Sequence, residues 1–194
     1  MDRTELPLEC WVEKGQIPKE LILNKEEYDI LWDSHPEKYH KIKIFNKLID
    51  TPRWQQAYGK SYSFSGNIST AKPFTNLLNT FLDWANHNES INGRSPTLNG
   101  ILVNWYQDGD HYIGWHSDDE SQIDGTSPIY TISLGINRTF KIRDKSTKTT
   151  KDYEFYNGDY FIMGGKFQKF YQHHVPKRTR CKNSRISITI RKFL

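Results

Sequence analysis

The residues best able to do chemistry are a histidine and an aspartate two positions apart, His116 and Asp118. Side chains of an extended segment alternate between its two faces, so we expect this imidazole and this carboxylate to point the same way. A second, distant imidazole would complete the facial triad that holds non-haem iron(II) and leaves positions open for other ligands. The adjacent His173 and His174 are the candidates for that third ligand. A hydrogen-bonded pair on the surface is the alternative.

Polar residues alternate with isoleucine in residues 185–191, which read Arg-Ile-Ser-Ile-Thr-Ile-Arg. This period of two predicts a strand whose isoleucine face lies in the core, so that the opposite face lines an interior. The opposite face consists of Arg185, Ser187, Thr189 and Arg191. Buried guanidinium groups require anionic partners, and a small dicarboxylate such as 2-oxoglutarate would pair with both while its keto acid end chelates the iron. Two surface arginines on an edge strand are the alternative.

Asn104 and Tyr106 lie two positions apart on a strand expected ahead of His116. By the same alternation they present an amide and a phenol to one side of that strand. We expect both side chains to hydrogen-bond the co-substrate.

The elements that position these residues fall into two groups. A capping box headed by Asn24 predicts a helix near residues 24–34, and apolar residues at helical spacing predict a second helix from Pro73 to just before Asn92. Later in the chain the pattern changes to short β-rich runs separated by glycine and aspartate turns. The predicted strands are Ile101 to Tyr106, Ile129 to Leu134, Thr139 to Ile142, Tyr153 to Tyr156, Tyr160 to Met163, and Arg185 to Phe193.

Helices early and many short strands late indicate an α+β fold. We expect a double-stranded β-helix, or jelly roll, of antiparallel strands with N-terminal supporting helices, and chemistry in the mouth between its sheets. No repeat or linker divides the chain. We therefore expect a monomer with a single domain over residues 1–194, in which residues 1–43 are an N-terminal extension.

Charge is distributed unevenly along the chain. Residues 160–194 hold nine lysines and arginines and no acid, although the whole chain carries only +4. A basic surface suits a polyanion such as nucleic acid, and an ordinary solvated face is the alternative.

Other features of the composition concern the compartment. The apolar runs are too short to span a bilayer, no secretory signal opens the chain, and two cysteines are too few for a disulfide framework. We expect an intracellular protein with reduced thiols and no membrane partner, in the nucleus if eukaryotic and otherwise in the cytoplasm.

Five separated segments resemble the AlkB family, in the same order and register. They are residues 104–106 (NWY), 114–120 (GWHSDDE), 133–140 (SLGINRTF), 172–177 (QHHVPK) and the arginine pair at 185 and 191. The resemblance runs from about Phe45 to Leu194. It implies a jelly-roll dioxygenase that uses iron(II), 2-oxoglutarate and oxygen to repair alkylated bases, with succinate, carbon dioxide and formaldehyde as products.

The resemblance also distinguishes between the neighbouring histidines. The family's distal iron ligand is followed, after one residue, by an apolar residue and then proline, which is the context of His173 and not of His174. Together with His116 and Asp118, His173 is therefore the implied ligand and catalytic set. One departure is Ser187, because the family usually has asparagine at this position.

Substrate contacts follow from the same resemblance. Residues 44–66 look like the family's nucleotide-recognition lid, where aromatic side chains hold a flipped base. Asp119 would contact the exocyclic group of that base. The implied contacts within the lid are Arg53, Tyr62, Ser63 and Phe64. Ordinary core packing of the two aromatic residues is the alternative.

Residues 44–47 (IFNK) resemble the hydrophobic finger of the animal AlkB homologue that prefers duplex DNA. An exposed Phe45, flanked by Asn46 and Lys47, would wedge into the gap left by a flipped nucleotide, whereas a buried Phe45 would be a core residue. The wedge favours double-stranded DNA, and the family resemblance implies bases such as 1-methyladenine and 3-methylcytosine as the substrates. RNA demethylation and protein hydroxylation by the same chemistry stay open, as does a non-enzymatic nucleic-acid-binding β-domain.

Overall fold

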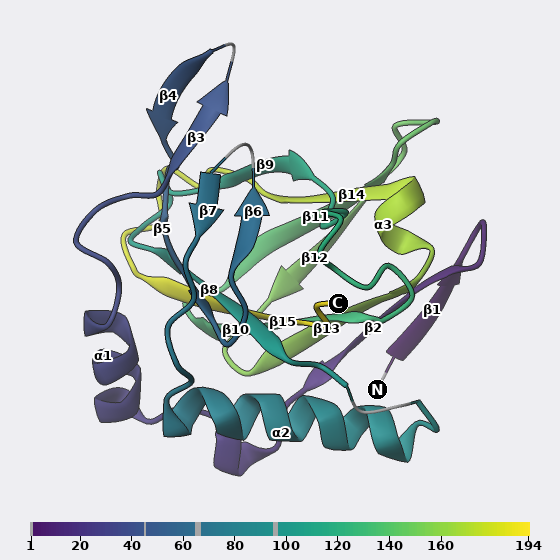
Figure 1. The fold of residues 1–194 in the computed structure, drawn as a ribbon, viewed down its shortest axis with the longest axis horizontal. Coiled ribbons are helices and arrows are strands. Elements are labelled where there is room, and N and C mark those ends of the chain that lie inside the picture. Colours follow the sequence, from purple (N-terminus) through teal and green to yellow (C-terminus); the bar gives the residue numbers. More distant parts are fainter. Residues whose placement is uncertain (1, 45, 65–66, 95–96) are drawn as a thin grey trace.

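Two antiparallel sheets form the centre of the computed structural model, which describes residues 2–44, 46–64, 67–94 and 97–194, with only the backbone at 43–44, 62–64 and 67. The larger sheet has the order β1-β2-β13-β10-β15-β8-β5, and the smaller sheet has the order β12-β11-β14-β9 (Figure 1). The strands of the larger sheet are β1 Asp2–Leu6, β2 Cys10–Gln16, β5 Trp54–Tyr58, β8 Gly100–Tyr106, β10 Ile129–Gly135, β13 Asp159–Gly165 and β15 Arg185–Arg191. Those of the smaller sheet are β9 Ile113–His116, β11 Arg138–Asp144, β12 Thr150–Phe155 and β14 Tyr171–Val175. This arrangement is the jelly roll that the sequence predicts.

The larger sheet has a hydrophobic core on each of its faces. On one face Ile186, Ile188 and Ile190 of β15 are fully buried in a core shared with helix α2 (Asn76–Ile91). On the other face Phe161 packs against Phe140 of the smaller sheet, with 5.3 Å between ring centroids. The alternation along β15 therefore places its polar face between the two sheets, as predicted.

Helix α1 (Lys25–Asp33) begins as the sequence predicts. The Asn24 side chain accepts a hydrogen bond from the backbone of Glu27, whose side chain accepts one in return from the backbone of Asn24. Helix α2 begins at Asn76 and not at Pro73, because the Thr75 side chain caps its first turn. The other described helical segments are η1 (Lys19–Leu21) and α3 (Phe167–Phe170). None of the described helices has the length and apolar character needed to cross a bilayer.

Six strands lie where the sequence predicts them, with some ends displaced. Strand β12 runs over Thr150–Phe155 instead of Tyr153 to Tyr156, and β15 ends at Arg191, beyond which Phe193 makes an isolated bridge to Ile123. The sequence pattern did not indicate β1, β2, β5 or β14. Through β1 and β2, the expected N-terminal extension contributes two strands to the larger sheet.

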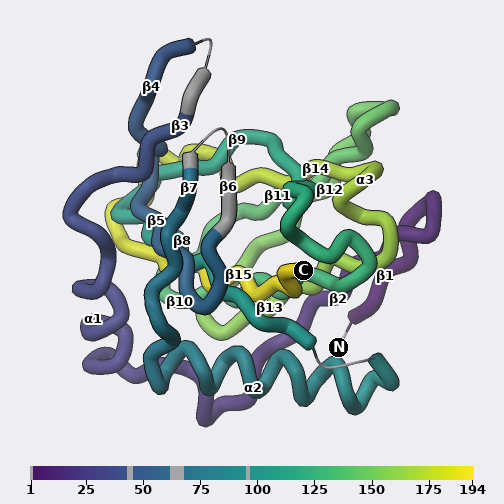
Figure 2. Tube along the Cα trace, viewed as in Figure 1, coloured from purple at the N-terminus to yellow at the C-terminus, as the bar shows by residue number. Residues whose placement is uncertain are grey.

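Two hairpins project from one side of the sheets (Figure 2). Strand β3 (Lys41–Ile44) pairs with β4 (Lys47–Asp50), and β6 (Tyr62–Phe64) pairs with β7 (Asn67–Ser69). All four residues of β4 are exposed. The β3–β4 hairpin thus extends into solvent with little packed around its second strand.

Candidate metal and co-substrate site

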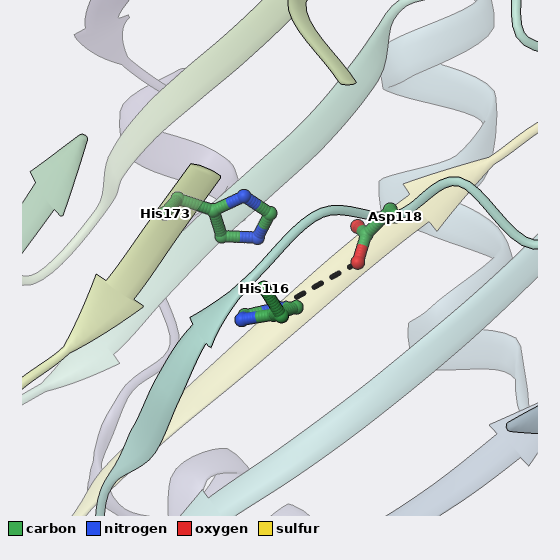
Figure 3. A group of neighbouring side chains, drawn as sticks. All are labelled: His116, Asp118 and His173. Carbon is green, nitrogen blue, oxygen red and sulfur yellow. Dashed lines mark ion pairs between the residues drawn. The ribbon is translucent and has the colours of Figure 1, made fainter. Parts of the chain in front are cut away.

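His116, Asp118 and His173 converge between the two sheets (Figure 3). One ligand atom from each lies within 4.8 Å of the others. His116 Nε2 is 3.6 Å from Asp118 Oδ1, and the two imidazole centroids are 4.1 Å apart. The histidines face each other across the β9–β14 pair, in register. Strand pairing therefore brings together residues that are far apart in the sequence.

Asp118 reaches this cluster from a turn. Strand β9 ends at His116. The expectation that His116 and Asp118 lie on one extended segment is therefore wrong for Ser117 and Asp118, which follow the strand. The Ser117 hydroxyl donates to the carbonyl oxygen of Tyr171 at 2.8 Å, and the Gln168 side-chain oxygen accepts from the backbone N–H of Asp118 at 2.9 Å. These two bonds to the α3–β14 segment aim the carboxylate at the histidines.

His173 and His174 occupy different environments. His173 is 6% exposed and belongs to the cluster. His174 points to the other face of β14, where Nδ1 hydrogen-bonds the carbonyl oxygen of Ile113 and the ring stacks on Trp115 at 4.5 Å. The structure thus brings His173, and not His174, to the other two ligands.

Electrostatics prepare the three side chains for a cation. Burial lowers the pKa of His116 and holds that of His173 well below its usual range, so both imidazoles are neutral. Burial alone would raise the pKa of Asp118, but the positive charge of Arg191 beside it is the main cause that lowers it, to about 2. Two neutral nitrogens and one carboxylate oxygen are the donor set of a 2-His-1-carboxylate iron(II) site.

The polar face of β15 lies beside these ligands. One cavity is lined by all three of them and by residues of the predicted co-substrate site, namely Asn104, Tyr106, Ser187, Thr189 and Arg191. The first two come from β8, which pairs with β15 so that Asn104 faces Ser187. The sheet thus brings Asn104, Tyr106, Thr189 and Arg191 around one space, and the fifth predicted residue, Arg185, is not among those that line it.

The two arginines of β15 have different partners. Arg191 Nη2 lies 2.8 Å from Asp118 Oδ2, so its anionic partner is the metal-binding carboxylate. Arg185 Nε donates to the Ser133 hydroxyl at 2.8 Å, and its Nη1 is buried without a hydrogen-bond partner among the described residues. In the described chain Arg191 thus has an anionic partner, whereas Arg185 has none within ion-pair distance, and the binding of one dicarboxylate by both arginines stays a prediction.

Arg185, predicted to bind 2-oxoglutarate, lies beside Tyr106. Its guanidinium carbon lies 5.1 Å from the centroid of the ring of Tyr106, a residue that lines the co-substrate cavity. Burial lowers its pKa to about 10, which leaves it charged at neutral pH. A buried cation with an unused N–H group is a receptor for an anion.

Arg53 and Glu120 complete the inner wall of the site. Arg53 is 4% exposed, and its Nε donates to the Asn104 side-chain oxygen at 2.8 Å, so Asn104 is held by protein. Glu120, which the sequence analysis did not single out, lines a cavity with Arg53, Asp118 and Arg191. Burial, with Asp118 beside it, raises the pKa of Glu120 to about 7. Its position at the end of the 114–120 segment is the only signal in the sequence.

A third cavity, of about 390 Å³, opens beside His116. It lies between β9 and the base of the β3–β4 hairpin, and its walls include Ile42, Ile49, Arg53 and Tyr112. Asp119 is largely exposed and lies 3.6 Å from Lys145 Nζ. The structure therefore places Arg53 at this cavity and at the one that Glu120 lines, and Asp119 on the surface next to the ligand Asp118.

The remaining residues that are predicted to contact the substrate fall within residues 45–47 and 62–64. Asn46 and Lys47 are exposed at the turn of β3–β4, whereas Phe45 lies outside the described residues. For Tyr62, Ser63 and Phe64 the structure describes the backbone of β6. Their substrate roles stay predictions.

Comparison with known proteins agrees with this site. The sequence pattern of the 2OG-Fe(II) oxygenase superfamily matches residues 12–191. The chain is 32% identical to the mouse (Mus musculus) DNA oxidative demethylase ALKBH2 over 165 residues, covering 79% of this chain and 67% of that protein. Against human (Homo sapiens) ALKBH2 the identity is 30%, covering 79% of this chain and 61% of that protein.

Two further comparisons cover less of the sequence or concern the fold alone. The mouse alpha-ketoglutarate-dependent dioxygenase alkB homolog 3 is 34% identical over 106 residues, 50% of this chain and 37% of that protein. The solved structure of OsALKBH1 has a TM-score of 0.60 at 16% identity, covering 98% of this chain and all of that one. The pattern that spans nearly the whole chain and the ALKBH2 relatives at about 30% identity show that this chain belongs to the AlkB family of iron(II)- and 2-oxoglutarate-dependent dioxygenases.

Proposed function

We propose that this chain is a DNA repair enzyme that oxidatively demethylates alkylated bases such as 1-methyladenine and 3-methylcytosine. The observation that carries the proposal is the cavity of about 390 Å³ beside His116, since its volume lies in the range of about 300–1,000 Å³ that is typical of small-ligand pockets. A base held there would present its methyl group to the metal ligands. ALKBH2 of mouse and of human is a DNA oxidative demethylase, which supports the same chemistry here.

The chain's own residues supply position and charge. When bound, iron(II) supplies the activation of oxygen that oxidises the methyl group, with 2-oxoglutarate as the second reductant. His116, Asp118 and His173 would hold the metal, and Arg191 fixes the second oxygen of Asp118. Arg185 would bind the distal carboxylate of 2-oxoglutarate beside Tyr106. Side chains in fixed positions lower the activation barrier of the reaction because they hold the reacting groups in the required orientation.

A basic loop supports a polyanionic substrate. Residues 176–184, here called the basic loop, join β14 to β15 and carry exposed Lys177, Arg178 and Arg180. Cationic side chains of this kind release counterions from phosphates and add affinity without sequence preference. We therefore assign the basic loop to the nucleic-acid backbone.

The β3–β4 hairpin favours duplex DNA within this proposal. Two apolar side chains of β4 stand in solvent, Leu48 at 61% and Ile49 at 42% exposure. Apolar residues on a projecting element wedge between base steps in proteins that open a duplex. The predicted wedge, Phe45, lies outside the described residues and directly precedes Asn46 in the sequence.

The experiment that tests the proposal is formaldehyde release with iron(II) and 2-oxoglutarate. The substrates are matched oligonucleotides with one 1-methyladenine or 3-methylcytosine, as single-stranded DNA, duplex DNA and RNA, with unmethylated oligomers and the His116→Ala variant as controls. We expect release from methylated DNA, and more from duplex DNA than from RNA. Release from RNA alone, or from none of the oligomers while 2-oxoglutarate is still consumed, would contradict the proposal.

A further inference from the structure

The loop that joins β8 to β9, residues 107–112, contacts several parts of the site at once. It follows Tyr106 of the co-substrate cavity and precedes the strand that carries His116. The Tyr112 N–H donates to the carbonyl oxygen of Pro52 at 3.0 Å, next to the β3–β4 hairpin. We call residues 107–112 the junction loop.

The junction loop is also bonded to the basic loop. The Gly109 N–H donates to the carbonyl oxygen of Cys181 at 2.9 Å, and the Arg178 N–H donates back to the carbonyl oxygen of Gly109 at 2.7 Å. A side chain at Gly109 would place its Cβ 1.7 Å from the Arg178 carbonyl oxygen. The two backbones therefore approach so closely that only glycine fits.

Arg138, the first residue of β11, lies beneath this contact. It is 1% exposed, Nη1 donates to the carbonyl oxygen of Asp108 at 2.9 Å, and Nη2 donates to those of His111 at 2.8 Å and Pro176 at 2.7 Å. Two of these acceptors belong to the junction loop and one to the basic loop. The planar fork of a guanidinium can reach three such acceptors at once, whereas a lysine offers one nitrogen.

The guanidinium group of Arg138 is not placed to contact a phosphate or to form an ion pair with a described residue. Its burial prevents direct contact with a phosphate, and among the described residues no carboxylate lies within ion-pair distance of it. Its guanidinium carbon is 5.6 Å from the Tyr106 ring, on which Arg185 also lies at 5.1 Å. Burying a guanidinium costs free energy, which the three carbonyl bonds offset only while both loops stay in place.

We propose that Arg138 is a positioning residue that locks the junction loop to the basic loop and so couples the co-substrate end of the site to the nucleic-acid end. Displacement of the junction loop would move Tyr106 and Arg185 on one side and the basic loop on the other. The nucleic-acid half of this coupling rests on the proposed function, whereas the 2-oxoglutarate half rests on the family's chemistry.

Substitutions at two positions, Arg138 and Gly109, test the proposal. Arg138→Met removes the three bonds, Arg138→Lys keeps the charge, and Gly109→Ala separates the loops while Arg138 stays. The matched control is Arg94→Met, which removes a bidentate pair with Glu89 at the end of α2, away from both loops. For each variant we measure the KM for 2-oxoglutarate from succinate formation, the Kd for an unmethylated DNA duplex, and the melting temperature.

We expect Arg138→Met and Gly109→Ala to raise both constants by about tenfold, since a shift of ~1 Å in a site can cost on the order of 100-fold. Arg138→Lys should recover part of each loss, and Arg94→Met should lower the melting temperature with both constants unchanged. If the junction variants only lower the melting temperature as Arg94→Met does, or change one constant alone, the coupling is refuted. If the native chain binds no nucleic acid, the proposed function fails, and the KM for 2-oxoglutarate still decides whether Arg138 positions Tyr106.

Discussion

The polar face of β15 and the β3–β4 hairpin both belong to the proposed reaction, yet different forces hold them. Every residue of β15 is buried, and the isoleucines on its other face anchor it in the core shared with α2. Every residue of β4 is exposed. Packing therefore holds the strand assigned to the chemistry, whereas the hairpin proposed to recognise the substrate is little constrained by the rest of the fold.

This difference has a measurable consequence. Changes on the packed side should affect every substrate alike, because the metal and co-substrate are common to all of them. Changes on the hairpin should affect one kind of substrate and leave the fold intact, because exposed side chains contribute little to folding. The following variants separate the two regions, beginning with the largest expected effect.

The metal ligands should give the largest effect. His116→Ala, Asp118→Ala and His173→Ala should each abolish turnover on all substrates, whereas His174→Ala should keep most of it, because only His173 faces the other ligands. Activity and binding of cobalt(II), followed by its absorption spectrum, measure this. Loss of metal binding in His174→Ala with survival of His173→Ala would overturn the assignment.

The two arginines of β15 should give the next largest effect. Removing one partner of a buried charge pair costs roughly 2–5 kcal/mol, so Arg185→Met should raise the KM for 2-oxoglutarate by roughly 30-fold or more. It should leave cobalt(II) binding unchanged, because Arg185 contacts no metal ligand. Arg191→Met should weaken metal binding as well, since Arg191 holds Asp118. Equal effects of the two variants on both constants would contradict the distinct partners that the structure gives them.

Much of this packed side was predictable from the sequence. The alternation in residues 185–191 predicts β15 and its polar face because isoleucine at every second position has no other low-energy place than a core. The partner of Arg191 was not predictable, because Asp118 reaches it through a turn that Ser117 and Gln168 set by tertiary contacts. Local pattern carries no information on such contacts.

Strands with polar residues at inward positions were also missed. In β14 the buried His173 replaces an apolar residue, and in β2 the inward Glu13 is 3% exposed and accepts a bond from the Tyr160 hydroxyl at 3.1 Å. Each polar residue weakens the apolar alternation by which a strand is recognised. In β14 the proposed metal ligand His173 is thus the residue that breaks the pattern by which the strand would have been predicted.

The hairpin should give a smaller and selective effect. If Phe45 fills the stack after a base leaves a duplex, Phe45→Ala should reduce repair of methylated duplex DNA by about tenfold and repair of the same lesion in a single strand much less, since flipping costs a few kcal/mol only in the duplex. The melting temperature should change little. Phe81→Ala in the core of α2 is the matched control, because truncating a buried phenylalanine costs about 3–5 kcal/mol. Equal activity losses on both substrates with a large drop in melting temperature would make Phe45 a core residue.

The smallest effect concerns an ion pair at the rim of the packed side, Asp124 with Lys192, whose charged atoms are 2.8 Å apart. Hydrogen bonds from Lys192 and Thr126 lower the pKa of Asp124 from 3.8 to about 2. A depressed carboxyl pKa stabilises the fold above the ordinary aspartate value, and this contribution is lost as the pH falls from about 4 to 2. Asp124→Asn should therefore melt about 1–3 °C below the native chain at pH 7, as expected for a partly exposed pair. The difference between the two melting temperatures should shrink as the pH falls below about 4 and vanish below pH 2, because protonated Asp124 and asparagine are both uncharged. A difference that stays constant from pH 7 to below pH 2 would contradict this, since it would mean that neutral hydrogen bonds and not the charge of Asp124 stabilise the contact.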